Sequence, residues 1–311
     1  MTKILTCLIV ALSVMSGLTE AQETIKPKTC VFKTVNETPL KADVYLPPND
    51  AKQHPVIVYM HGGALILGSR QGRPRLPLRD KLLKAGYVVV SIDYRLAPIT
   101  KAEDIAKDVE DACKWVRKEG PKLFSIDPDR LVVMGGSAGG YLSRLMGYKL
   151  KPAPQAIVSF SGYGDLLWFN EARIKQLPQT IPPFNKTGEE WGWEFYSYTR
   201  KYGIWIKEVT GLDPDQDSDK LKKLRPIENI TEEYPPTLLA HGKSDDDVPY
   251  EQAVKMKQAL DTKHVRCEFI TVPSGHSSQM IWEYPEIVDQ TLTFLESFVG
   301  RKPNMGIKTT R

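Results

Sequence analysis

The sequence predicts an α/β protein with a mostly parallel central sheet flanked by helices. Six short apolar runs lie along the chain without polar alternation, which is typical of strands buried on both faces. Segments of helical length separate several of these runs, and such alternation is typical of a parallel sheet with right-handed crossovers. We expect strands at 55–60, 87–92, 130–135, 156–161, 237–242 and 267–272.

A hairpin and several helices complete the predicted fold. Residues 28–47 carry β-branched residues in alternation around a polar turn, which is typical of a hairpin. In segment 102–117 the apolar residues recur at helical spacing, so they share one face. These residues are Ile105, Val109, Ala112 and Val116. Two further helices are expected at 250–263 and 286–299.

One interval is too long for a simple crossover. About 75 residues separate the strands at 156–161 and 237–242. Segment 166–234 holds four of the six tryptophans, and a loop of this length in a compact domain usually has a function. We therefore expect residues 22–311 to form a single domain with a cap insertion at about 166–234.

The first 21 residues have the pattern of a secretory signal peptide. A lysine near the start precedes an apolar run from Ile4 to about Val14, and small or polar residues follow as far as Ala21. The apolar run is shorter than the roughly 20 residues that a membrane span needs. We expect cleavage before Gln22, export to the extracellular space or periplasm, and no stable membrane insertion afterwards.

Charge and cysteine content argue against several other classes of protein. The net charge is +4, and the one tight basic cluster, at 219–225, resembles a solvated helical face, so no nucleic-acid partner is expected. Three cysteines remain after the predicted cleavage, without zinc or redox spacing. No calcium-loop or zincin pattern is present, so we expect no bound metal.

A serine surrounded by glycines is the strongest chemical signal in the chain. Residues 135–139 read GGSAG, which fits the pattern G-x-S-x-G directly after an apolar strand and before a helix-like segment. In such a turn the serine hydroxyl projects beyond the edge of the sheet, and the small neighbours leave room for a substrate. Ser137 is therefore the candidate nucleophile.

A serine nucleophile needs a base, and the chain has five histidines. His276 follows the last predicted strand, so its loop should lie at the same sheet edge as the serine, and we interpret it as the base. His54 and His264 are expected at the surface. His61 and His241 each end a strand and are expected to brace their turns.

The acid that orients the base should lie between the serine and the histidine in the chain. Residues 241–249 contain three consecutive aspartates in the arrangement H-G-x-x-D-x-x-V-P, which selects Asp245. Asp247 is the next candidate. Asp246 and Asp247 are otherwise expected to be solvated or to cap the following helix.

Donors for a reaction oxyanion are the remaining part of the site. His61 opens the sequence HGGA directly after the first parallel strand. The backbone N–H groups of Gly62 and Gly63, with that of Ala138 after the nucleophile, are the predicted oxyanion hole.

Together these motifs resemble the α/β-hydrolase superfamily, in particular its esterases with an HGG oxyanion motif. The segments HGGALILGS and SIDYRLAP are similar to those of hormone-sensitive-lipase-like esterases. That group usually carries an aspartate where this chain has Gly136. The segment HGKSDDDVP instead resembles the catalytic domain of prolyl-oligopeptidase-type peptidases.

The resemblance implies a secreted serine carboxylic-ester hydrolase with an α/β-hydrolase fold, no cofactor, and a small-molecule or polymer-linked ester as substrate. A serine peptidase or amidase of the prolyl-oligopeptidase type is the first alternative. A non-catalytic binding protein with the same fold is the second. The sequence makes no prediction about oligomeric state or about the particular ester.

Overall fold

A computed structural model describes residues 25–49, 51, 53–72, 76–170 and 188–300. The predicted signal peptide, residues 1–21, and part of the predicted cap, residues 171–187, lie outside the described residues.

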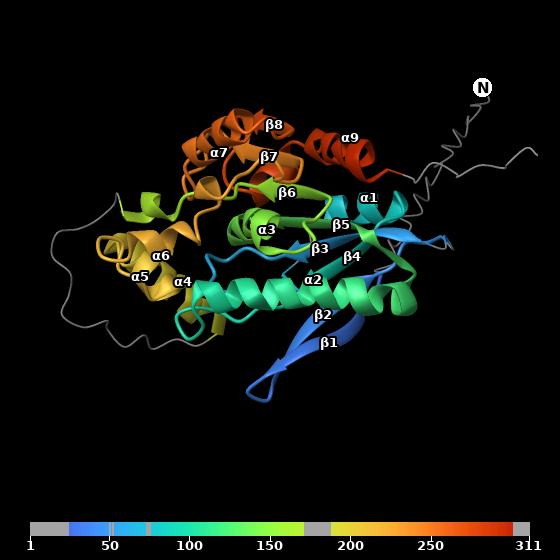
Figure 1. Cartoon of the computed structure of the whole chain (residues 1–311), viewed down its shortest axis with the longest axis horizontal. Helices are drawn as coiled ribbons and strands as arrows, with labels where there is room; N and C mark the ends of the chain where they lie inside the picture. The colour runs from blue at the N-terminus through green and yellow to red at the C-terminus, as the bar shows by residue number, and fades with distance from the viewer. Residues whose placement is uncertain (1–24, 50, 52, 73–75, 171–187, 301–311) are drawn as a thin grey trace, which may run out of the picture.

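The centre of the molecule is an eight-stranded sheet with the strand order β1-β2-β4-β3-β5-β6-β7-β8 (Figure 1). The two pairs that involve β2 are antiparallel, and the five remaining pairs are parallel. This confirms the predicted fold class. The strands are β1 (Lys28–Val35), β2 (Thr38–Tyr45), β3 (His54–Met60), β4 (Val88–Ile92), β5 (Ile126–Gly136), β6 (Ala156–Phe160), β7 (Thr237–Gly242) and β8 (Cys267–Val272).

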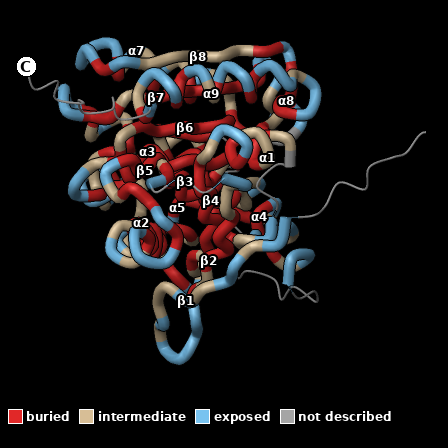
Figure 2. The backbone as a smooth tube through the Cα atoms, turned by 90° about the vertical axis from the view of Figure 1, so that its right-hand side faces the viewer, coloured by how far each residue is buried: buried red, intermediate tan, exposed pale blue. Residues whose placement is uncertain are grey.

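Helices cover both faces of this sheet, so the central strands are buried (Figure 2). One face packs against α2 (Ala102–Phe124), α3 (Ala138–Lys149) and α7 (Glu251–Thr262). The other face packs against α1 (Leu76–Lys84), α8 (Ser278–Glu283) and α9 (Glu286–Val299). Burial on both faces explains why β3 to β7 are apolar runs rather than alternating patterns.

Helix α2 has the apolar face that its sequence predicts, since Ile105, Val109, Ala112 and Val116 are fully buried. The helix is longer than predicted, because it continues past Pro121 to Phe124. Strand β5 also begins earlier than predicted, at Ile126, which pairs with His54.

His54 is not at the surface, as the sequence had led us to expect. Its side chain is buried, and Nδ1 lies 2.9 Å from the carbonyl oxygen of Gly86. The prediction was wrong because the loop that ends α1 folds back over the start of β3, a contact between segments 32 residues apart.

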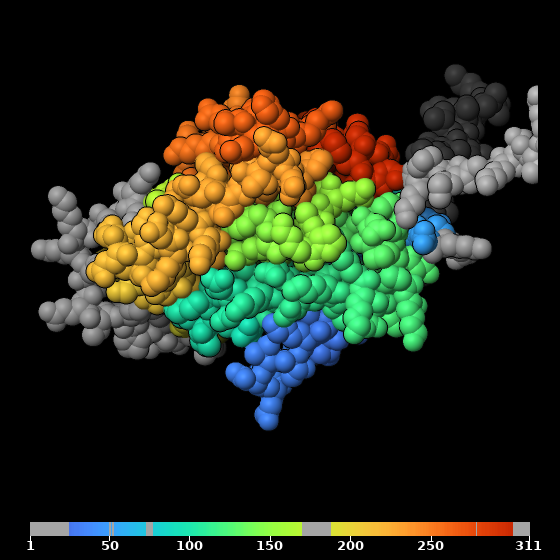
Figure 3. All heavy atoms as spheres, in the orientation of Figure 1, coloured from blue at the N-terminus to red at the C-terminus, as the bar shows by residue number. Residues whose placement is uncertain are grey.

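In the described part of the long interval between β6 and β7 lie five elements, which are η1 (Leu166–Asn170), α4 (Gly188–Lys201), α5 (Trp205–Thr210), α6 (Ser218–Lys222) and η2 (Pro226–Glu228). Helices α4 to α6 gather at one end of the molecule, drawn in yellow in Figure 3. A small aromatic core holds this segment, in which Phe169 stacks on the buried Trp205 at 3.9 Å between ring centres.

Among the residues that the structure describes, Cys30, Cys113 and Cys267 are free cysteines. None of the helices in that part of the chain has both the length and the hydrophobicity that crossing a bilayer requires.

Candidate active site

Ser137 occupies the turn between β5 and α3, where its backbone has φ 56° and ψ −121°. A residue other than glycine at positive φ costs roughly 1–3 kcal/mol, so surrounding contacts must hold it. Its N–H donates to the carbonyl oxygen of Phe160 at 2.8 Å, and its carbonyl oxygen accepts from the N–H of Tyr141 at 3.0 Å. The turn is therefore tied to both β6 and α3.

The glycines around Ser137 allow backbones to touch. A Cβ at Gly139 would lie 2.1 Å from the carbonyl oxygen of Met60, and one at Gly135 would lie 2.5 Å from the carbonyl carbon of Gly139. Backbone atoms have no alternative rotamer, so any side chain there would push α3 away from β3 and β5. Helix α3 can begin directly against the sheet only because these positions lack a Cβ.

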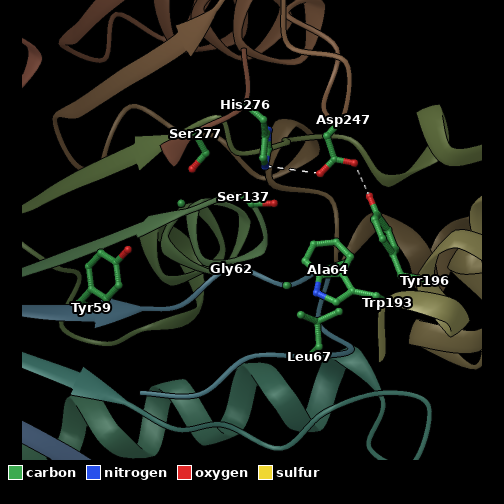
Figure 4. Close-up of a pocket in the computed structure, with 12 residues that line it drawn as sticks. Tyr59, Gly62, Ala64, Leu67, Ser137, Trp193, Tyr196, Asp247, His276 and Ser277 are labelled. Carbon is green, nitrogen blue, oxygen red and sulfur yellow. Dashed lines mark hydrogen bonds and ion pairs between the residues drawn. The ribbon is translucent and has the colours of Figure 1, made fainter. Parts of the chain in front are cut away.

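His276 lies above Ser137 in the same pocket (Figure 4). Its ring nitrogen Nδ1 contacts the carboxylate of Asp245, which does not line the pocket. The imidazole Nδ1 is 2.8 Å from one carboxylate oxygen of Asp245 and 3.0 Å from the other. The carboxylate accepts hydrogen bonds only, so Nδ1 carries the proton. That tautomer leaves Nε2 as the basic nitrogen on the side of the pocket.

The side chain of Asp245 is fully buried and has several donors besides His276. Its carboxylate accepts hydrogen bonds from the backbone N–H groups of Asp247, at 3.0 Å, and Val248, at 2.8 Å. Nε2 of His241 lies 3.2 Å from the second carboxylate oxygen and 2.9 Å from the carbonyl oxygen of Val248. His241 thus braces the turn, as predicted, and also contacts the acid.

These donors decide the charge of Asp245. Burial disfavours the carboxylate, but hydrogen bonds from His241, His276 and the backbone hold the pKa of Asp245 well below its usual range. The acid therefore stays ionised behind the imidazole.

The basic nitrogen of His276, Nε2, faces the pocket that contains Asp247 and Ser137. It lies 3.5 Å from a carboxylate oxygen of Asp247. Among the described residues the structure records no hydrogen bond from Ser137 to His276. Such a contact is often long in a site without substrate and shortens when one binds.

The predicted oxyanion loop lies beside the serine. A Cβ at Gly62 would be 3.4 Å from Cβ of Ser137, and Gly63 has φ 108°, a region that favours glycine. The carbonyl oxygen of Gly63 accepts from the N–H of Leu67 at 3.0 Å, which closes the loop into a tight turn. Ala138 is the first residue of α3, where backbone N–H groups have no partner within the helix.

The side chain of His61 holds the loop of Gly62 and Gly63 in place. Its ring stacks on Tyr94 at 4.1 Å, and Nδ1 lies 2.7 Å from the carbonyl oxygen of Gly62. The hydroxyl of Tyr94 donates to the carbonyl oxygen of His61 at 2.7 Å. Burial lowers the pKa of His61 to about 4, so the ring is neutral at neutral pH. The histidine braces its turn, as predicted.

The role that the sequence indicated for Asp247, a solvated or capping aspartate, was wrong. Its carboxylate accepts a hydrogen bond from the hydroxyl of Tyr196 at 2.8 Å (Figure 4). It also pairs with Arg200, and both partners come from α4. The opposite side of the same carboxylate faces His276. No local signal predicts this arrangement, since α4 lies about 50 residues earlier in the chain.

These residues enclose a pocket of about 180 Å³. Ser137, His276, Gly62 and Gly63 line it, and Asp245 stands behind the histidine. Helix α4 contributes two aromatic side chains to its rim, Trp193 and Tyr196. Four of the predicted site residues therefore line one cavity at the carboxyl edge of the sheet, and Asp245 contacts one of them.

No cluster of three or more histidine, cysteine, aspartate or glutamate side chains is placed to hold a metal ion in the part of the chain that the structure describes.

Comparison with known proteins identifies the family. The BD-FAE family model matches residues 42–260, which span the sheet from β2 to β7 and both the serine and aspartate loops. The chain belongs to the BD-FAE family. This is a family of α/β-hydrolase-type esterase domains, and the membership confirms the predicted superfamily.

Solved structures agree with this fold. An esterase from Thermogutta terrifontis superimposes with a TM-score of 0.67 and 22% identity, covering 91% of this chain and 96% of that one. Its sarin-phosphonylated form gives a TM-score of 0.65, also at 22% identity, with 89% and 97% covered.

Among curated proteins, the non-reducing polyketide synthase pkbA of Emericella nidulans is 30% identical over 353 residues, and ascC of Acremonium egyptiacum is 28% identical over 300. These matches cover 88% and 80% of this chain but 14% of each relative. The BD-FAE chain thus corresponds to a small part of those proteins.

The buried His61 should make the protein less stable in mild acid. The unfolded chain takes up a proton near pH 6.5 and the folded chain only near pH 4, so stability falls as the pH drops between these values. Between pH 7 and pH 5 this contributes a loss of about 2 kcal/mol. Urea unfolding of the wild type and His61→Gln at both pH values measures it, and an equal pH dependence of the two proteins would contradict it.

Asp245, rather than its neighbours, should be the acid that His276 needs. Asp245→Asn removes the charge and favours the wrong imidazole tautomer, so turnover of an activated ester should fall by about 10⁴. Asp246→Asn is the matched control, because Asp246 is exposed and adjacent, and it should retain activity. Initial rates decide, and a larger loss in Asp246→Asn than in Asp245→Asn would refute the assignment.

Proposed function

We propose that this BD-FAE protein is a serine esterase that cleaves carboxylic esters through an acyl-enzyme on Ser137. One observation carries the proposal. A serine in a strained strand-to-helix turn and a histidine paired with a buried carboxylate group line the same small pocket, together with Gly62 and Gly63.

The first half of the reaction forms the acyl-enzyme. His276 Nε2 takes the proton of Ser137 Oγ as the oxygen attacks the ester carbonyl carbon. The N–H groups of Gly62, Gly63 and Ala138 stabilise the oxyanion of the tetrahedral intermediate. The imidazolium then gives the proton to the leaving alkoxide oxygen as the C–O bond breaks, and the alcohol departs.

The second half repeats these steps with water. His276 deprotonates a water molecule that attacks the acyl carbon, and the proton returns to Ser137 Oγ as the acid is released. Asp245 keeps its charge throughout, because its donors hold its pKa low, and it stabilises the imidazolium in both steps.

The pocket favours a short acyl group. An apolar cavity of roughly 150 Å³ binds benzene in an engineered protein, so about 180 Å³ holds a group of similar size. Structures of the Thermogutta terrifontis esterase are described with butyrate and with propionate bound. By this analogy the proposed substrates are esters of small acids, either free or attached to a polymer.

We also propose that the protein is exported after removal of residues 1–21. The proposal rests on the sequence pattern at that end of the chain. The mass of the N-terminal peptide from the culture medium tests it, with Gln22 as the expected first residue.

The test of the proposed reaction is the initial rate on p-nitrophenyl acetate, butyrate, octanoate and decanoate. The wild type should be most active on the two short esters, and Ser137→Ala should lose about 10⁶ in turnover. Ser297→Ala, at an exposed position of α9, is the control and should retain full activity. A folded wild type that is inert on all four esters would overturn the proposal in favour of a peptidase or a binding protein.

A further inference from the structure

A second hollow lies next to the catalytic pocket, and the two share a lining residue. The second hollow is a groove of about 680 Å³, and its apolar lining includes Ile66, Leu96, Ala97, Pro98, Ile99 and Trp191. Leu67 lines this groove and also lines the catalytic pocket. It is therefore the wall that the two hollows share.

The backbone of Leu67 is fixed on both sides. Its N–H donates to the carbonyl oxygen of Gly63. The next residue, Gly68, has φ 104° and packs closely on the His61 ring, so that a Cβ at Gly68 would lie 2.5 Å from Nδ1 of His61. Helix α4 closes the other side, since a Cβ at Gly192 would lie 2.8 Å from Cβ of Leu67. The side chain beyond Cβ is the part of this wall that a substitution can remove without moving the loop.

The position of Leu67 relative to the reaction selects the acyl side of the ester. The leaving oxygen must lie next to His276, which protonates it. Figure 4 shows Leu67 on the opposite side of Ser137 from His276, just beyond the glycine loop that would hold the carbonyl oxygen. An acyl chain that extends away from the histidine therefore runs toward Leu67.

We propose that Leu67 limits the length of the acyl chain, and that the groove behind it is an apolar subsite for longer acyl chains once this side chain is smaller. The inference rests on the proposed esterase function. Apolar chains suit the groove because its aliphatic and indole surfaces bury methylene groups favourably.

The test compares kcat/KM of the full chain on p-nitrophenyl esters from acetate to decanoate for the wild type and Leu67→Ala. The ratio of octanoate to acetate should rise at least about tenfold in the variant, because each added methylene in an apolar pocket is worth about that much. Leu67→Val, a smaller change, should give a smaller rise and serves if Leu67→Ala does not fold. Leu67→Met, a side chain of similar volume, should keep the ratio of octanoate to acetate close to that of the wild type.

Two further variants locate the effect. Leu123→Ala removes a half-exposed leucine of α2 far from the groove and should keep the wild-type rates. Ile99→Ser, added to Leu67→Ala, should remove part of the gain, because Ile99 is an almost fully exposed wall of the groove and not part of the core.

The outcomes separate this inference from the proposed function. An active wild type with the same chain-length profile in the folded Leu67→Ala and Leu67→Val proteins overturns the role of Leu67 and leaves the esterase intact. A parallel series keeps the acetyl group and lengthens the alcohol. If the kcat/KM of Leu67→Ala rises only in that series, the acyl assignment is overturned. A wild type that hydrolyses none of the esters overturns the proposed function, and the subsite with it.

Discussion

The close approach of α3 to the end of β3 is the constraint on which the site depends. Gly139 lies against the carbonyl of Met60, and this contact lets the helix begin one residue after Ser137. The serine must then adopt a left-handed backbone, and its neighbours on β6 and α3 hold it there by hydrogen bonds. The same approach brings Gly62 next to the serine. The backbone of Ser137 and the place of the glycine loop beside it thus both follow from one packing contact.

A buried charge organises the other half of the pocket. Asp245 is stable as a carboxylate only because two histidines and two backbone N–H groups donate to it. Each donor is fixed in turn by its own strand or loop, so the carboxylate sets the tautomer and direction of His276. His241, which reads in the sequence as a turn residue, belongs to this arrangement through its contact with the acid.

The sequence predicted what is local and failed where distant segments meet. The strands, α2 and the order of the serine, aspartate and histidine loops follow from apolar runs and short motifs that each occupy consecutive residues. His54 and Asp247 were misplaced because their partners, Gly86 and α4, come from other parts of the chain. Leu67 carried no signal at all, since its position between two hollows depends on how α4 packs against the glycine loop.

A nucleophilic Ser137 activated by His276 should react with a fluorophosphonate probe. The reaction of the full chain with this probe is followed by mass measurement of the intact protein and its peptides. We expect one adduct per chain, on the peptide that contains Ser137, and much slower labelling of His276→Ala. A folded protein that stays unlabelled, or that carries the adduct on another residue, would contradict it.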